Sequence, residues 1–118
     1  MTRAIDLLKN KFGVSQLYKY DIKDSEDNIV FTVYWHPLTI AEREAIQKKT
    51  GVDDANNYAL QLMIDKALDK DGNRLFQDGD KASLRREIEA NILQEIQLAM
   101  IDAGLNKEVE IAKADLKS

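Results

Sequence analysis

Residues 29–42 read IVFTVYWHPLTIAE, and within this stretch a strand pattern gives way to the start of a helix. The β-branched and aromatic residues alternate as in a strand, and Pro37 ends the run because it lacks the amide that a sheet ladder needs. Thr39 and Glu42 then stand three residues apart, which is the spacing of a capping box. The stretch therefore predicts a strand that leads directly into a helix, which ends before Gly51.

A second strand pattern precedes this one. Tyr18, Tyr20 and Ile22 alternate with charged residues, and the polar turn formers of residues 24–28 separate the two runs. Two such runs around a short polar segment are typical of an antiparallel hairpin, which needs a covering layer to be stable in water. We expect helices to cover one face of the hairpin, and another strand or a partner to cover the other.

A short helix is predicted before the hairpin. Residues 2–12 have apolar side chains at helical spacing, with Thr2 as a cap and Gly13 as the stop. A helix this short is marginal in isolation. We therefore expect it to dock on another surface or to stay mobile.

The second half of the chain predicts two longer helices. The first is capped by Asp53 or Asp54 and runs towards Leu68, and its apolar residues spread almost all round it, which predicts burial. The second begins near Lys81 and ends at Gly104 as one continuous helix, because apolar residues step by four along it. These residues are Leu84, Ile88, Ile92, Ile96 and Met100.

The fold class that we expect is α+β, predominantly α-helical, with an antiparallel β-hairpin near the N-terminus. A length of 118 residues suits a single domain. We divide that domain into a short N-terminal helix (1–13), the hairpin (14–36), a helical body (37–105) and a charged tail (106–118). The tail has the pattern of a frayed helix.

Composition argues against several classes of function. The chain has 17 basic and 21 acidic residues and a formal net charge of −4, whereas nucleic-acid-binding domains rely on cationic surfaces. It has no cysteine and one histidine, which removes disulfides, thiolate nucleophiles and His-rich metal centres. Its apolar runs are too short for a secretory signal or a membrane span. We expect neither a nucleic-acid nor a membrane partner.

Patterns of catalytic or metal-binding residues are weak. Asp69, Asp71 and Asn73 have the spacing of calcium ligands, but an EF-hand loop needs glycine where Arg74 stands, and a turn explains the same residues. His36 has no activated nucleophile beside it, and there is no glycine-rich phosphate loop. A hydrolase that uses paired carboxylates is the weakest alternative. We expect a protein that is not an enzyme, with no catalytic residue, metal ion or cofactor.

The sequence has more apolar surface than a small fold easily hides. Any one of these apolar residues is more often part of the core than of a contact surface. Together, however, they favour self-association or a hydrophobic partner. We expect apolar segments of such a partner to bind, as a helix in a groove, to a surface made by the final helix and the aromatic hairpin, where methionines adapt to varied partners. The candidate partner-binding residues are Tyr34, Trp35, Met63, Ile92, Ile96 and Met100.

A family resemblance follows from two of these stretches. The tail assembly chaperones of long-tailed bacteriophages have a strand-to-helix junction that resembles residues 33–43, VYWHPLTIAER. A second feature of that family is similar to residues 69–76, DKDGNRLF, with Asp78 and Asp80 before the last helix. The order of elements is similar over residues 14–105, which is most of the chain.

The resemblance implies a non-enzymatic assembly factor that is present in the cytoplasm of the bacterial host and absent from the mature virion. Its implied partners are the tape measure protein and the tail tube protein, which such chaperones are thought to keep soluble while the tail polymerises. Self-association into a homo-oligomer agrees with the surplus of apolar residues. Two alternatives remain: a structural head–tail connector or tail completion protein of the virion, and a small phage or prophage adaptor that binds a host protein.

Overall fold

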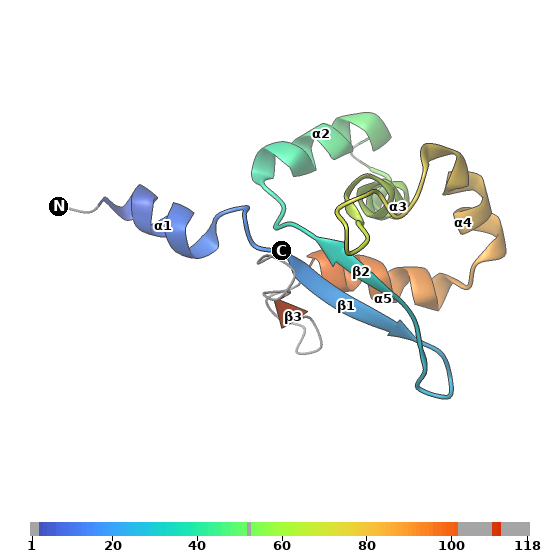
Figure 1. The fold of residues 1–118 in the computed structure, drawn as a ribbon. Helices are drawn as coiled ribbons and strands as arrows, with labels where there is room; N and C mark the ends of the chain where they lie inside the picture. Colours follow the sequence, from blue (N-terminus) through green and yellow to red (C-terminus); the bar gives the residue numbers. More distant parts are fainter. Residues whose placement is uncertain (1–2, 52, 102–109, 112–118) are drawn as a thin grey trace.

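The structure, a computed structural model, describes residues 3–51, 53–101 and 110–111. It is the α+β architecture that the sequence predicts, mostly helical with a hairpin near the N-terminus (Figure 1). In chain order the elements are α1 (Ala4–Phe12), β1 (Tyr18–Lys23), β2 (Ile29–Trp35), α2 (Ile40–Thr50), α3 (Ala55–Lys66), the 3₁₀ turn η1 (Asp78–Asp80), α4 (Lys81–Glu87), α5 (Ala90–Ile101) and β3 (Glu110–Ile111).

β1 and β2 form the predicted antiparallel hairpin. Tyr20 faces Val33 across the ladder, so the apolar side chains of the two strands share one face of the sheet. That face packs against the helices and forms one side of the core. On the other face, the Thr32 hydroxyl donates a hydrogen bond of 2.7 Å to the Asp21 carboxylate.

Short pairings extend the sheet beyond the hairpin. Leu68 forms isolated bridges with both Tyr34 and Arg74. The Leu68 amide donates to the Tyr34 carbonyl at 2.7 Å, and the Tyr34 amide donates to the Leu68 carbonyl at 2.9 Å. A single extended residue therefore pairs with the outer edge of β2 at Tyr34.

The opposite edge of the sheet is extended by β3, which pairs antiparallel with the first residues of β1. At Glu110 and Ile111 the expectation of a frayed helix in the tail is therefore wrong, because these residues hydrogen-bond to a neighbouring strand instead of to their own turn. The rest of the tail, the helix end predicted at Gly104 and the cap predicted at Thr2 lie outside the described residues.

Capping chemistry fixes where α2 and α3 begin. The Glu42 amide donates to the Thr39 hydroxyl at 3.1 Å, and the Thr39 amide donates to the Glu42 carboxylate at 3.0 Å. The predicted capping box is therefore confirmed. Of the two caps left open for α3, the structure selects Asp54, whose carboxylate accepts from the Asn57 amide at 3.0 Å.

The predicted long C-terminal helix is broken in two. α4 ends at Glu87, Ile88 has an extended backbone (φ −111°, ψ 139°), and α5 begins at Ala90. The prediction of one continuous helix is wrong because a straight helix over the same residues would extend for about 30 Å. The break lets both α4 and α5 pack against α3. It leaves Ile88 44% exposed at the corner.

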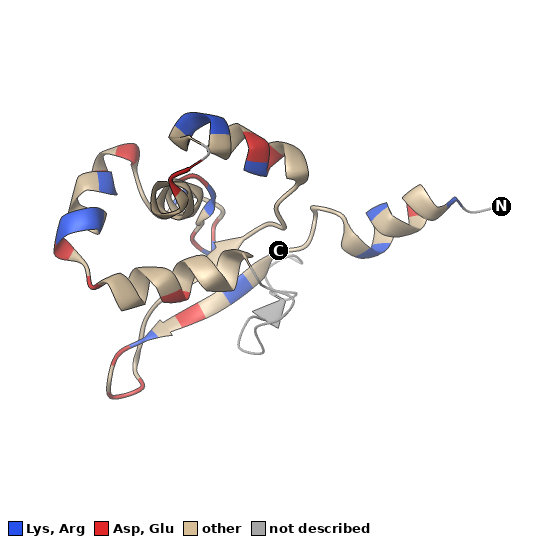
Figure 2. Ribbon diagram, turned by 180° about the vertical axis from the view of Figure 1, so that it is seen from behind, with Lys and Arg blue, Asp and Glu red and all other residues tan. Residues whose placement is uncertain are grey.

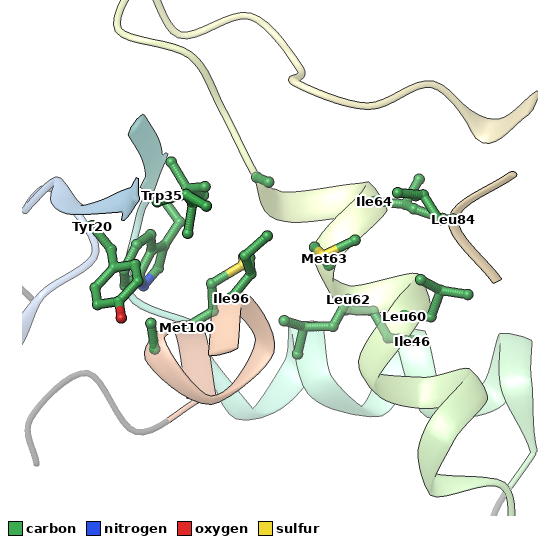
Figure 3. Packing of buried hydrophobic residues seen from close by; sticks show 14 residues of the cluster. Tyr20, Trp35, Ile46, Leu60, Leu62, Met63, Ile64, Leu84, Ile96 and Met100 are labelled. Atoms are coloured by element: carbon green, nitrogen blue, oxygen red, sulfur yellow. The ribbon is translucent and has the colours of Figure 1, made fainter. Parts of the chain in front are cut away.

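The core lies between the sheet and the helices, and α3 is its centre (Figure 3). Four residues of α3 are buried, in agreement with the apolar pattern around this helix. Strands and flanking helices contribute the rest. The buried residues of this cluster are Tyr20, Ile22, Val33, Trp35, Ile46, Leu60, Leu62, Met63, Ile64, Ala67, Leu84, Ile96, Ala99 and Met100.

Two loops, 24–28 and 69–73, share one hydrogen-bond pattern. In each loop the aspartate carboxylate at the first position accepts from the backbone amides of the third and fifth residues, at 2.9 or 3.0 Å. The fourth residue has a positive φ, +67° at Asp27 and +87° at Gly72. The aspartate spacing that resembles a calcium loop is thus explained at 69–73 by a turn in which Asp69 satisfies backbone amides.

α1 stands apart from this body. All nine of its residues are described, and none of them is buried. Both views of the ribbon show the helix projecting from one end of the molecule (Figures 1 and 2). The Cα radius of gyration is 15.3 Å, compared with about 13.5 Å for a compact domain of this length. α1 is therefore an arm beside the body and not part of its core.

Candidate functional site

The six candidate partner-binding residues do not form one surface. Trp35, Met63, Ile96 and Met100 lie in the core, with exposed fractions of 3% or less (Figure 3). A partner cannot reach them while the protein is folded, because their side chains fill the space between the sheet and the helices. The structure therefore places these four predicted contact residues in the core and not on an exposed surface.

The other two candidates are half-buried and separate. Tyr34 lies on the face of the sheet opposite to that of Val33 and Trp35, and its backbone pairs with Leu68. Ile92 packs against the core from α5. The structure therefore offers no common docking surface made from Tyr34 and Ile92.

Among the residues that the structure describes, the largest group of exposed apolar side chains lies on α1. Ile5, Leu8 and Phe12 share one face of the helix because residues three and four apart are neighbours on a helix surface. Lys9 and Lys11 lie on opposite flanks of this stripe. The exposed fractions are 43% for Ile5, 52% for Leu7, 53% for Leu8 and 76% for Phe12. The sequence held the signal for this surface, since a short amphipathic helix needs something to dock against.

The arm and the body have opposite net charge. Residues 3–12 contain three basic and one acidic residue, a net charge of +2, whereas residues 13–101 contain 11 basic and 16 acidic residues, a net charge of −5. Figure 2 shows the blue residues of α1 beside a body in which acidic residues occur on most elements. The arm is thus a cationic amphipathic helix attached to an acidic domain.

An open groove of about 410 Å³ lies between α3 and α5, with Arg85 of α4 beside it. The Asn57 side-chain oxygen is buried there and has no hydrogen-bond partner among the described residues. The groove is therefore not fully apolar, and one of its buried polar atoms has no hydrogen-bond partner among the described residues. Its walls include Asn57, Leu60, Ala90, Leu93, Gln94 and Gln97.

A network of ion pairs holds the segment after α3 against the body. The Asp65 carboxylate, 15% exposed, accepts from Lys49 at 3.0 Å and from Gln61 at 2.9 Å, and it lies 3.6 Å from the Arg74 guanidinium. Arg74 also donates to Asp78 at 3.0 Å. These contacts fix the path of the chain between α3 and α4.

Glu42 joins α2 to α3 through an ion pair with Lys66. The hydrogen bond from the Lys66 ammonium, followed by that from the Thr39 amide, holds the pKa of the Glu42 carboxyl below its ordinary value. A group whose pKa is lower in the folded state stabilises the fold above its unfolded-state pKa, and this stability is lost as the pH falls through the folded-state pKa.

Replacing Glu42 by glutamine is expected to keep the capping-box acceptor and remove the charge. The stability gap between the native protein and Glu42→Gln should be widest at neutral pH and should close as the pH falls through the acid range. Urea unfolding at several pH values measures it, with Glu44→Gln on the same helix as the control. A gap that does not change with pH would contradict the role of the ion pair.

His36, which the sequence analysis considered as a catalytic residue, makes a structural contact. Nδ1 of His36 donates to the Gln16 carbonyl at 2.7 Å, which ties the segment before β1 to the end of β2. Among the residues that the structure describes, no cluster of His, Cys, Asp and Glu is arranged to hold a metal ion. Within the described ranges, no helix combines the length and the apolar character needed to cross a bilayer.

Comparisons of the chain with known protein families, with curated proteins and with solved structures found no match.

Proposed function

We propose that the protein is a non-enzymatic tail assembly chaperone of a long-tailed bacteriophage, which binds the tape measure protein, tail tube subunits or both and keeps them soluble during assembly. The resemblance of residues 33–43 and 69–76 to that family supports the proposal. The structural observation that carries it is α1, an amphipathic helix held outside the body with its apolar stripe open to solvent.

A chaperone for helical, aggregation-prone clients needs apolar side chains that are accessible and yet kept in solution. Full burial of a Leu, Ile or Phe side chain contributes about 1.5–3 kcal/mol, so the stripe of Ile5, Leu8 and Phe12 gives a useful but reversible contact after the cost of association. The acidic body keeps the loaded complex soluble.

The length of the arm suits a long client that is covered by many copies. α1 has nine residues, so it is about 13.5 Å long and covers only a few turns of a client helix. Many weak contacts along one long polypeptide hold it by avidity and are released one at a time. This agrees with a factor that is needed in the host cytoplasm during assembly and is left out of the finished particle.

The experiment is co-expression of the full chain with the long helical tape measure protein that the proposal expects to be encoded beside it. The native protein should keep the client in the soluble fraction and co-purify with it. Leu8→Asp and Phe12→Asp should each lose most of this effect, because a buried carboxylate opposes apolar contact. Val30→Asp is the matched control, since Val30 is 61% exposed on β2 and remote from the arm.

Three outcomes would contradict the proposal in different ways. If the arm variants retain the client as well as Val30→Asp does, α1 is not the contact surface. If the protein is found in purified virions, the connector or tail completion alternative replaces the chaperone, and if it binds one folded host protein instead, the adaptor does. The fluorescence of Trp35, the single tryptophan, shows whether each variant remains folded.

A further inference from the structure

We infer that α1 also binds the surface of an anionic phospholipid bilayer, with its apolar stripe between the lipids and its lysines at the headgroups. This goes beyond the proposed function, because it gives α1 a second partner of different chemistry. The sequence predicts no membrane partner because its apolar runs are too short for a span or a secretory signal, but a helix that lies along a bilayer surface needs neither. The arrangement of charge around α1 carries the inference.

The apolar stripe and the lysines of α1 share one half of the helix. Successive residues of an α-helix are rotated by about 100°, so Ile5, Leu8 and Phe12 lie within about 60° of one another. Lys9 and Lys11 lie beyond the two edges of this stripe, and the arc from one lysine to the other is about 160°. A flat anionic surface therefore contacts the stripe and both lysines at the same time.

The single acidic residue of α1 lies away from this half of the helix. Asp6 is about 130° from the middle of the apolar stripe, so its carboxylate stays in water when the stripe is buried. A lysine can bury its hydrocarbon stem along apolar surface while its ammonium reaches the headgroup phosphates. The two lysines and the aspartate thus have the positions that a cationic helix needs on an anionic bilayer.

The acidic body does not have to approach the bilayer. Residues 13–101 have a net charge of −5, so an anionic surface repels them. Both ribbon views show α1 projecting from one end of the molecule (Figures 1 and 2). Residues 13–16 join α1 to the body, where the Gln16 carbonyl accepts from His36. Four residues span at most about 14 Å when extended, and the Debye length at physiological ionic strength is about 8 Å. The tether is therefore long enough to screen most of this repulsion.

The contact with the bilayer is weak and reversible. Stable anchoring to a membrane takes two signals, whereas α1 is one short amphipathic helix. The protein therefore divides between the bilayer surface and solution. A client that binds the apolar stripe competes with lipid for the same side chains, so client binding releases the protein from the membrane.

The test measures binding of the full chain to vesicles by cosedimentation. One set of vesicles contains phosphatidylglycerol and phosphatidylcholine in equal parts, and the other contains phosphatidylcholine alone. The native protein should bind the anionic set at least about tenfold more tightly than the neutral set, and added salt should weaken this binding. Equal binding to both sets, or binding to neither, overturns the inference.

Two variants of α1 separate the apolar contribution from the cationic one. Leu8→Asp places a carboxylate in the stripe, and Lys9→Glu with Lys11→Glu changes the net charge of the arm from +2 to −2. Each should weaken binding to the anionic vesicles by about tenfold or more. The matched controls, Val30→Asp and Lys48→Glu, make the same changes at exposed positions of the body and should bind like the native protein. The urea midpoint of each variant shows that its fold is unchanged.

The outcomes distinguish this contact from other uses of α1. If Leu8→Asp binds the anionic vesicles as tightly as the native protein, the contact is electrostatic only and the inference falls. Client retention is measured separately, by the co-expression experiment. If α1 retains the client but the vesicles are not bound, this inference falls and the chaperone stands. If the vesicles are bound through α1 but the client is ignored, the proposed function falls and the membrane contact stands.

Discussion

Replacing Trp35 by alanine is expected to lower the free energy of unfolding by about 3–5 kcal/mol. The Trp35 side chain is 1% exposed and lies in the core, and its ring is 5.9 Å from that of Tyr18. Truncation removes one of the largest fully buried side chains and leaves a cavity that the sheet and helices cannot close. Urea unfolding followed by far-UV circular dichroism measures the loss as a lower midpoint with an unchanged slope.

Val30→Ala on the same strand is the control for this truncation. Val30 is exposed, so its replacement should change stability by no more than about 0.5 kcal/mol. If Trp35→Ala were as stable as Val30→Ala and failed only in client binding, Trp35 would be a contact residue, as the sequence pattern first indicated, and its place in the core would be wrong.

Replacing Asp65 by alanine is expected to cost about 1.5–3 kcal/mol, the range for hydrogen bonds to a charged group. Asp65 is the shared acceptor for Lys49 and Gln61, and it lies beside Arg74. Its removal takes away a mostly buried acceptor, and of its partners the Lys49 ammonium, 59% exposed, is the one that water readily solvates. The segment after α3 then depends on the hydrogen bonds that remain from Arg74, to the Ile64 carbonyl at 3.1 Å and to Asp78.

Asp65→Asn separates the charge from the hydrogen bonds, because it keeps an acceptor oxygen and the same size. It should cost less than Asp65→Ala, and added salt should narrow the gap between Asp65→Asn and the native protein. Glu44→Ala, an exposed carboxylate on α2, should have little effect in the same urea unfolding experiment. A loss for Asp65→Ala no larger than that for Glu44→Ala would contradict the network.

Much of the fold could be predicted from the sequence because the signals that begin and end its helices and strands are local. The capping box at Thr39, the proline after β2 and the polar turn between the strands act through neighbouring residues, and the structure has all three. The break at Ile88 is different. The spacing of apolar residues by four continues through Ile88, so the sequence pattern gives no sign of a break. α4 ends there because α4 and α5 must both pack against α3.

The candidate surface was harder to predict, because an apolar pattern identifies which side chains avoid water and not what covers them. Trp35 and Ile96 have neighbours in the fold, so they are core. Leu8 and Phe12 have the same apolar character but lie on a helix that the body does not cover. The weakness of an isolated short helix was the one sequence signal that separated these two groups. The groove, which joins residues far apart in the chain, left no such signal.

The loop at the tip of the hairpin offers a place for a reporter group. Asp24 satisfies the amides of residues 26 and 28, so the side chain at position 25 takes no part in those hydrogen bonds. The chain contains no cysteine, and Ser25→Cys would therefore introduce a unique thiol for a dye. In Figure 1 this tip points away from α1. Dyes of two colours on separate batches would then report, by energy transfer, how far apart two copies hold their hairpins.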